Sequence, residues 1–237
     1  MPNPVFHFKQ FTIHQERCAM KVGTDAVLLG SWVQPPKEGR MLDVGTGTGI
    51  IALMLAQRCN GEVLGIDADA QAVEQALENF ANSPWGLRLK AVHRSFQEQL
   101  LQNDAGWDLI VSNPPYFNQS FKAPEESRNL ARHTIMLDLE TLVLGAASLL
   151  SSGGSFAIIL PSQEGPKATE LAKKHGLFLS RCTEVITRPG KPPKRWLLQW
   201  TTKPVVCQNN QLVIEAEGRH RYSEAYQELT RDFYLNG

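Results

Sequence analysis

Several features that would place a protein in a special class are absent from this sequence of 237 residues. No apolar run approaches the roughly 20 residues that a membrane-spanning helix needs. The opening residues, MPNPVFHFKQ, also lack the apolar stretch of a secretory signal. We therefore expect a cytoplasmic protein that has no membrane as a partner.

Cysteine is scarce, and its placement is uninformative for metal or redox chemistry. The four cysteines are Cys18, Cys59, Cys182 and Cys207, and no two of them form a C-x-x-C pattern. We expect reduced thiols and no bound metal. An excess of charge is lacking too, because 24 basic residues balance 24 acidic ones. That balance argues against a protein that binds long stretches of nucleic acid through phosphates alone, although it allows a local basic patch.

The residues that are present suit a folded enzyme of ordinary size. Hydrophobic residues make up 42% of the chain, which is enough for a substantial core. The run Pro35–Gly39 breaks the chain after a lead segment, residues 1–36, which we expect to pack on a catalytic domain of residues 37–237. From Arg40 onward, short β-rich runs alternate with helical patterns, and this alternation predicts a parallel sheet with helices on both faces.

Periodicity and turn residues predict the individual elements. Strands are expected over Met41–Val44, Glu62–Asp67, Leu87–His93, Trp107–Ser112 and Ser155–Leu160, and helices over Asp25–Trp32, Gly49–Gln57, Leu139–Leu150 and Gln163–His175, with another helix capped by Asp69. The pair Gly153-Gly154 is expected to end the helix before it. Leu177–Thr187 and Arg195–Thr202 leave no room for a helix between them, so they predict an antiparallel hairpin. The result is a mostly parallel seven-stranded sheet with a C-terminal antiparallel hairpin and a ligand crevice at the carboxyl ends of its strands.

A glycine-rich loop follows the first strand of this sheet. It reads D-V-G-T-G-T-G over Asp43–Gly49, and glycines there permit a tight turn and a close approach of a ligand to the backbone. A dinucleotide fingerprint would require glycine at the position of Ile50. The loop instead resembles the first motif of class I S-adenosylmethionine-dependent methyltransferases, which implies their Rossmann-like fold and S-adenosylmethionine as the cofactor. An ordinary strand–helix turn is the alternative interpretation of the glycines.

The same resemblance implies roles for individual residues around the cofactor. The loop, with Gly45 and Gly47, would surround the methionine and ribose part, and Asp43 would lie near the methionine end. The acidic side chain of Asp67, at the end of the next strand, would accept hydrogen bonds from the ribose hydroxyls. Ser95 and Phe96, after the third strand, would line the adenine pocket. A nicotinamide-dependent enzyme shares the acidic residue but not the glycine spacing.

A second motif, Asn113-Pro114-Pro115-Tyr116, follows the fourth strand. Two prolines in succession stiffen a loop, because each fixes φ and removes a backbone donor. The Asn113 side-chain oxygen and the Pro114 carbonyl could each accept an N–H of an amino group, which would direct its lone pair toward a methyl donor. Tyr116 could stack on a planar substrate rotated out of its own stack, and Phe117 could supply a second apolar face.

This motif resembles the N-P-P-Y loop of amino methyltransferases. Those enzymes act on N6 of adenine, on N4 of cytosine, or on the side-chain amide of glutamine. The motif alone does not choose between adenine N6 and a protein glutamine N5, or between RNA and DNA. A rigid loop that merely ends a strand is the structural alternative for the motif. A methyltransferase fold that serves as a non-catalytic RNA-binding module is the alternative from a different functional class.

The lead and the tail resemble one family more specifically. Phe8–Phe11, Met20–Asp25 and Leu28–Gly30 in the lead, and Tyr222-Ser223 with Phe233–Leu235 in the tail, are similar to the bacterial tRNA1(Val) adenine-37 N6-methyltransferases. The helical N-terminal domain of glutamine methyltransferases would not fit into about 35 residues. The resemblance implies tRNA as the partner, a monomer, and Lys21 and Thr24 near the methionine end of the cofactor. Thr24 or Asp25 could instead cap the helix that follows.

Basic residues gather in the predicted hairpin. Arg188, Lys191, Lys194 and Arg195 occur with no acidic residue between Val185 and Val205. Contact with tRNA phosphates is one interpretation, and a solvated turn is the other. Arg132, in the long polar stretch after the N-P-P-Y motif, is a further candidate for contact with tRNA.

Overall fold

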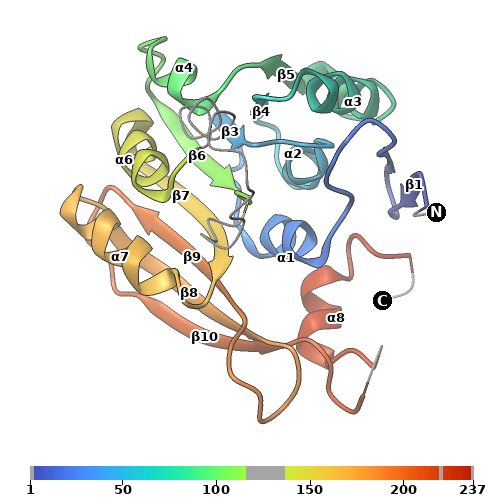
Figure 1. Cartoon of the computed structure of the whole chain (residues 1–237), viewed down its shortest axis with the longest axis vertical. Coiled ribbons are helices and arrows are strands. Elements are labelled where there is room, and N and C mark those ends of the chain that lie inside the picture. Colours follow the sequence, from blue (N-terminus) through green and yellow to red (C-terminus); the bar gives the residue numbers. More distant parts are fainter. Residues whose placement is uncertain (1–2, 116–136, 219–220, 236–237) are drawn as a thin grey trace, which may run out of the picture.

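The structure, a computed structural model, describes residues 3–115, 137–218 and 221–235. An eight-stranded sheet crosses the molecule in the order β10-β8-β9-β7-β6-β3-β4-β5 (Figure 1). Its strands are β3 (Arg40–Val44), β4 (Glu62–Asp67), β5 (Leu89–His93), β6 (Trp107–Ser112), β7 (Leu150–Pro161), β8 (Phe178–Ile186), β9 (Arg195–Thr201) and β10 (Gln208–Val213). Only β9 runs antiparallel to its neighbours, β7 and β8, so the predicted mostly parallel sheet with a C-terminal hairpin is confirmed.

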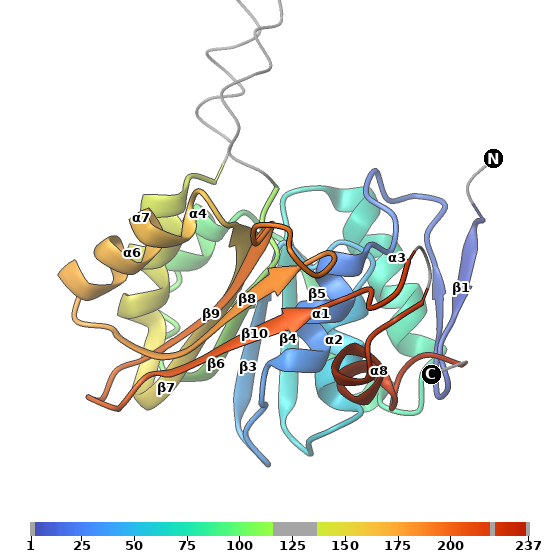
Figure 2. The ribbon, with the colours of Figure 1, turned by 90° about the horizontal axis from the view of Figure 1, so that it is seen from below.

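Helices cover both faces of this sheet (Figures 1 and 2). One face carries α1 (Thr24–Trp32), α2 (Ile50–Ala56), α3 (Ala70–Ala81) and α8 (Glu224–Thr230), and the other carries α4 (Phe96–Leu100), α6 (Leu139–Leu149) and α7 (Gly165–Lys174). The central strands between them are buried on both sides, whereas the edge strand β10 is mostly exposed. In β6, Leu109 and Val111 join the core beneath α1 and α2, while Ile110 joins the core beneath α6. Burial on both faces explains the unbroken apolar run of this parallel strand.

The lead segment adds a small sheet outside the main one. Strand β1 (Val5–His7) pairs antiparallel with β2 (Thr12–His14). Phe8, Phe11 and Ile13 are buried in the same core cluster as the side chains of α1, α2 and α3. The proposed boundary at residue 36 between a lead segment and a catalytic domain stays a prediction.

Some elements differ from the sequence-based expectation. The main sheet has an eighth strand, β10, which was not expected. The other unexpected elements are the β1–β2 hairpin, α4, α8 and the 3-10 turn Gly86–Arg88. The prediction that Thr24 or Asp25 caps α1 is wrong, because α1 begins at Thr24 and its N-cap, Gly23, makes no side-chain cap bond. The predicted cap of α3 is confirmed, since the Asp69 carboxylate accepts the Gln71 N–H at 2.9 Å.

The expected role of Gly153-Gly154 as a helix stop is also wrong. Helix α6 ends at Leu149, and both glycines lie inside β7. The register of β7 against β6 shifts between Trp107 and Leu109, and a Cβ on Gly154 would lie only 2.7 Å from the Trp107 carbonyl oxygen. The glycine pair therefore accommodates an irregularity in the strand, where the neighbouring backbone comes very close.

Candidate active site

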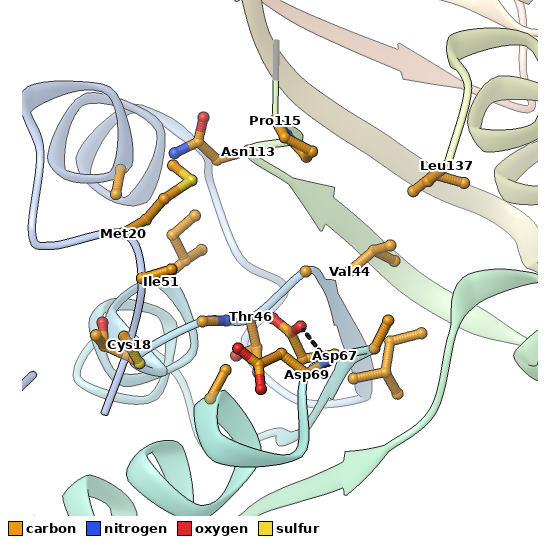
Figure 3. Close-up of a pocket in the computed structure, with 18 of the residues that line it drawn as sticks. Cys18, Met20, Val44, Thr46, Ile51, Asp67, Asp69, Asn113, Pro115 and Leu137 are labelled. Atoms are coloured by element: carbon orange, nitrogen blue, oxygen red, sulfur yellow. Dashed lines mark hydrogen bonds between the residues drawn. The ribbon is translucent and has the colours of Figure 1, made fainter. Parts of the chain in front are cut away.

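A cavity of about 360 Å³ opens at the carboxyl ends of β3, β4 and β6 (Figure 3). This volume lies within the range of roughly 300–1,000 Å³ that is usual for small-molecule sites. Its walls come from five segments that are distant in sequence: residues 18–22 of the lead, the glycine loop after β3, the end of β4 with the residues that follow, the segment after β5 and the segment after β6. The sequence-based expectation of a crevice at this edge of the sheet is confirmed.

The glycine loop presents bare backbone to this cavity. Gly45 and Gly47 line it with φ values of 74° and 53°, and a Cβ placed on either would meet nothing within 4 Å. Positive φ is a conformation that side chains rarely adopt, so glycine is needed here for conformation as well as for close approach. The N–H groups of Gly45 and Thr46 donate to the Ile66 carbonyl, at 2.9 and 3.0 Å, and attach the loop to β4.

Asp67 occupies the cavity wall at the end of β4 (Figure 3). Its Oδ2 accepts the Gly47 N–H at 2.9 Å, and its Oδ1 accepts the Asp69 N–H at 3.0 Å. Because an ionised carboxylate has about four acceptor positions, both oxygens retain capacity for a ligand's hydroxyl groups. The geometry suits the expected role at the ribose and adds a second one, which is to hold the glycine loop.

Asp43 lies beneath the glycine loop and has no exposed surface. Its Oδ2 accepts the Thr46 hydroxyl at 2.7 Å, and it is not among the residues that line the cavity. Burial raises the pKa of its carboxyl to about 7, with a smaller contribution from the negative charge of Asp67, while the Thr46 hydrogen bond lowers it. Asp43 thus supports the loop from below, and its expected place near the methionine end stays a prediction.

The wall after β5 combines an apolar ring with a helix start. Ser95 and Phe96 both line the cavity, and their expected place beside the adenine stays a prediction. Ser95 is also the N-cap of α4 in a capping box, in which it accepts the Glu98 N–H and Glu98 accepts the Ser95 N–H. Phe96 is 3% exposed and belongs to the core beneath α6. Packing of this kind holds the Phe96 ring in a fixed place on the cavity wall.

The lead segment supplies residues that sequence reasoning partly missed. Lys21 lines the cavity, but its ammonium donates to the carbonyls of Gln15, Glu16 and Cys18 within the lead itself. Thr24 is exposed at the start of α1 and is not among the lining residues. Cys18 and Met20 line the same wall and were not expected there (Figure 3). Met20 belongs to the run Met20–Asp25 that carries the family resemblance, which could have indicated it, whereas no periodicity or motif marks Cys18.

The N-P-P-Y motif begins directly at the cavity. Asn113 and Pro115 line it, whereas Pro114 is buried and is not among the lining residues (Figure 3). The motif follows β6, whose last residue donates from the Ser112 hydroxyl to the Val44 carbonyl at 2.8 Å and so joins the ends of β6 and β3. Tyr116, Phe117 and Arg132 lie outside the described residues. Asn113 and the glycine loop therefore share one cavity, as the order of the motifs along the chain predicted.

The basic hairpin turn lies at the same edge of the sheet. Strand β8 runs parallel to β6, so the turn that follows β8 is at the carboxyl edge. Two of its four cations are ion-paired, Arg188 with Glu215 at 2.7 Å and Arg195 with Asp25 at 2.9 Å. Lys191 and Lys194 are exposed.

Comparison with known proteins identifies the family. The Methyltransferase small domain family matches residues 18–178. A tRNA1(Val) (adenine(37)-N6)-methyltransferase of Bacteroides fragilis is 47% identical over 99% of this chain and 99% of its own length. One from Phocaeicola vulgatus is 48% identical over the full length of both. The chain belongs to the tRNA1(Val) (adenine(37)-N6)-methyltransferase family.

Solved structures agree on the fold of this methyltransferase. A predicted O-methyltransferase from Agrobacterium tumefaciens superimposes with a TM-score of 0.70 at 18% identity, covering 88% of this chain and 96% of that one. A putative RNA methyltransferase from Pyrococcus horikoshii gives a TM-score of 0.54 at 15% identity, covering 74% and 79%. At such identities the likeness shows the Rossmann-like class I methyltransferase fold alone.

The described residues of this methyltransferase fit S-adenosylmethionine. Gly45 and Gly47 leave room beside their backbone, Asp67 offers a carboxylate for hydroxyl groups, and Phe96 offers an apolar face. Within residues 3–115, 137–218 and 221–235, no group of three or more His, Cys, Asp or Glu side chains could hold a metal. In the same part of the chain, no helix is both long enough and apolar enough to cross a membrane.

Proposed function

We propose that this protein methylates N6 of adenine 37 in tRNA1(Val) with S-adenosylmethionine as the methyl donor. The observation that carries the proposal is the shared cavity: the glycine loop and Asp67 form one wall, and Asn113 opens into the same space. Full-length relatives at 47% and 48% identity bear the name of this activity.

The chain's own residues would hold the cofactor from three sides. The backbone at Gly45 and Gly47 would contact its methionine and ribose part, the Asp67 carboxylate would accept its ribose hydroxyls, and Phe96 would pack on its adenine. When bound, S-adenosylmethionine supplies an electrophilic methyl group on a sulfonium. Lys21 would contribute mainly by stiffening the lead, since its ammonium already donates to three backbone carbonyls.

Asn113 would orient the amino group that receives the methyl group. An exocyclic amine attacks poorly, because its lone pair is delocalised into the ring. If the Asn113 side-chain oxygen and the Pro114 carbonyl each accept one N–H, the lone pair points out of the ring plane and the nitrogen can become tetrahedral. The methylated nitrogen is cationic and strongly acidic, so the reaction needs no strong base. Tyr116 and Phe117 would stack on the base, as the family's motif implies.

Contact with the tRNA would come from the carboxyl edge. Lys191 and Lys194 project from the turn as exposed side chains, Arg188 is exposed as well although it pairs with Glu215, and Arg132 would add a further contact. Because the chain's formal charge is zero, such a local patch would carry the phosphate contacts. We expect the protein to act in the cytoplasm, where its tRNA substrate is, and to act as a monomer.

A methylation assay tests the proposal directly. The purified protein is incubated with labelled S-adenosylmethionine and bacterial tRNA that lacks this modification, and the methylated nucleoside is identified after digestion. We expect N6-methyladenosine from the wild type and at least a hundredfold lower rate from Asn113→Ala, because positioning contributes several kcal/mol. Asn210→Ala, an exposed residue of β10, is the matched control.

Other outcomes separate the alternatives. Label in a protein fraction and none in RNA would move the assignment to a glutamine amide. Label in DNA would move it to another adenine substrate. Binding of cofactor and tRNA without turnover on any amine would indicate a non-catalytic RNA-binding role.

A further inference from the structure

The lead segment forms one wall of the cavity without regular secondary structure. We call residues 15–22 the strap, because they connect β2 to α1. Cys18, Ala19, Met20, Lys21 and Val22 of the strap all line the cavity. Figure 3 shows Cys18 and Met20 on this wall, with the glycine loop and Asp67 beside it. Since no strand ladder or helix holds the strap, other groups must set its position relative to the loop.

Asn79 of α3 bonds to both walls at once. It is 1% exposed. Its Oδ1 accepts the His14 N–H at 2.8 Å, and its Nδ2 donates to the His14 carbonyl at 2.8 Å. The second N–H of Nδ2 donates to the Thr48 carbonyl in the glycine loop at 2.9 Å. One buried amide thus fixes the backbone just before the strap and the backbone of the loop to the same helix.

Three further side chains, those of Gln75, Gln15 and Lys21, stiffen the strap. Gln75, one turn before Asn79 on α3, accepts the Arg17 N–H at 3.2 Å and is 1% exposed. Within the strap, Gln15 accepts the Val22 N–H at 2.7 Å. The Lys21 ammonium gathers the carbonyls of Gln15, Glu16 and Cys18. The strap is therefore a self-bonded unit. It is attached to α3 through the Asn79 bonds just before it, the Gln75 bond and an Arg17–Glu78 ion pair at 3.2 Å, and to residues 3 and 4 through Gln15.

We propose that Asn79 is a positioning residue of the cofactor site, which sets the spacing between the strap and the glycine loop. Asn79 itself does not line the cavity, whereas Thr48, whose carbonyl it holds, does. It therefore acts on the cofactor only through the two walls. This inference depends on the proposed use of S-adenosylmethionine and not on the identity of the methyl acceptor.

The consequence is a selective effect on cofactor binding. Removing the amide leaves the partly buried backbone groups of His14 and the buried carbonyl of Thr48 without this partner, and the two walls are no longer held by one group. Displacement of either wall weakens every contact that the cofactor makes across the cavity. The N-P-P-Y loop follows β6 and makes no hydrogen bond to Asn79 among the described residues, so chemistry on bound cofactor and contact with tRNA should change little.

Two variants and one control test the proposal by calorimetric titration of the full-length protein with S-adenosylmethionine. Asn79→Ala removes all three bonds. Asn79→Asp keeps the shape and the acceptor for the His14 N–H, but it places an oxygen against the carbonyls of His14 and Thr48. The control is Thr183→Val, which also removes a buried hydrogen bond, the one that Thr183 accepts from the Trp32 indole N–H. Neither residue lines the cavity. Thermal unfolding of each variant is recorded first.

We expect both Asn79 variants to raise the dissociation constant of S-adenosylmethionine roughly tenfold or more. The KM for the cofactor should rise in parallel, while kcat at saturating cofactor stays within about threefold and the KM for tRNA is unchanged. Thr183→Val should bind the cofactor like the wild type even where its melting temperature falls equally. If Asn79→Ala does not fold, Asn79→Asp carries the test.

The opposite results would overturn the inference. A folded Asn79→Asp with wild-type cofactor affinity, or an equal loss of affinity in Thr183→Val, would reduce Asn79 to a general stabilising residue. A fall in kcat with an unchanged KM for the cofactor would contradict a positioning role at this site. Failure of the wild type to bind S-adenosylmethionine would instead reject the proposed function, so the two failures are distinguishable.

Discussion

Asp43 should make the free energy of unfolding fall as pH rises between about 4 and 7. Carboxylates with a lowered pKa in the folded protein have the opposite effect. Its carboxyl has no exposed surface, and burial is the main reason that its pKa rises from 3.8 to about 7. Between these two pH values the folded protein retains a proton that the unfolded chain has released. The substitution Asp43→Asn removes the titration but keeps the shape and an oxygen that can accept the Thr46 hydroxyl.

The sign and size of the effect follow from proton linkage. Because the folded state binds more protons in this window, the free energy of unfolding falls as pH rises from about 4 to 7 and levels off above the folded pKa. A tenfold change in proton affinity is worth about 1.4 kcal/mol, so the full effect is at most about 4 kcal/mol. Between pH 5 and pH 8 the wild type should lose about 3 kcal/mol relative to the Asp43→Asn variant.

Urea unfolding of both proteins at pH 5, 6, 7 and 8 measures this difference. Titration of all other groups is common to the two proteins, so it cancels when their free energies of unfolding are subtracted. We expect the free energy of unfolding of Asp43→Asn, relative to that of the wild type, to increase steadily up to pH 7 and to stay constant above it. A constant difference across the whole range would show that Asp43 is ionised in the folded protein at pH 5 and would refute the reasoning from burial.

Two further predictions concern the ligands. The Asp67 carboxylate accepts the N–H groups of both Gly47 and Asp69, whereas the side chain of Asp67→Asn has only one acceptor oxygen. Since hydrogen bonds to charged groups contribute about 1.5–3 kcal/mol, we expect this variant to bind S-adenosylmethionine roughly 10- to 100-fold more weakly in calorimetry. Unchanged affinity would exclude Asp67 from the ribose site. Replacing both exposed lysines, Lys191 and Lys194, by alanine should raise the KM for tRNA and leave the affinity for the cofactor unchanged. The slope of log tRNA affinity against log salt concentration should fall by roughly 2. A salt dependence like that of the wild type would show that the turn is solvated and does not contact tRNA phosphates.

Local sequence patterns were sufficient to predict the central part of the sheet and the edge at which the cavity opens. Strands β4 and β6 were predicted to the residue, because each is a short apolar run bounded by turn residues and buried in a parallel sheet. The spacing of Gly45, Gly47 and Gly49 and the position of Asp67 predicted the cavity wall. These features are local: a loop that needs positive φ must carry its glycines in sequence, and the order of parallel strands brings the carboxyl ends together.

Tertiary contacts decided the features whose determinants lie on other segments. Residues Gln208–Val213 show no apolar alternation that would predict a strand, yet they form β10 because β8 offers its edge in parallel register. The pair Gly153-Gly154 was predicted to stop a helix, but it lies within β7. There the Trp107 carbonyl comes so close to Gly154 that a side chain would not fit.

The strap shows the same dependence most clearly. Its place against the cavity depends on a bond between Asn79 and His14, which are 65 residues apart. The ion pair of Arg195 with Asp25 joins residues 170 positions apart and holds the basic turn to the start of α1. Local sequence sets backbone conformation and burial pattern, but a buried amide or an ion pair is placed by whatever the finished fold brings opposite it. For that reason the glycine loop could be predicted from the sequence, whereas the position of the strap in the cavity wall could not.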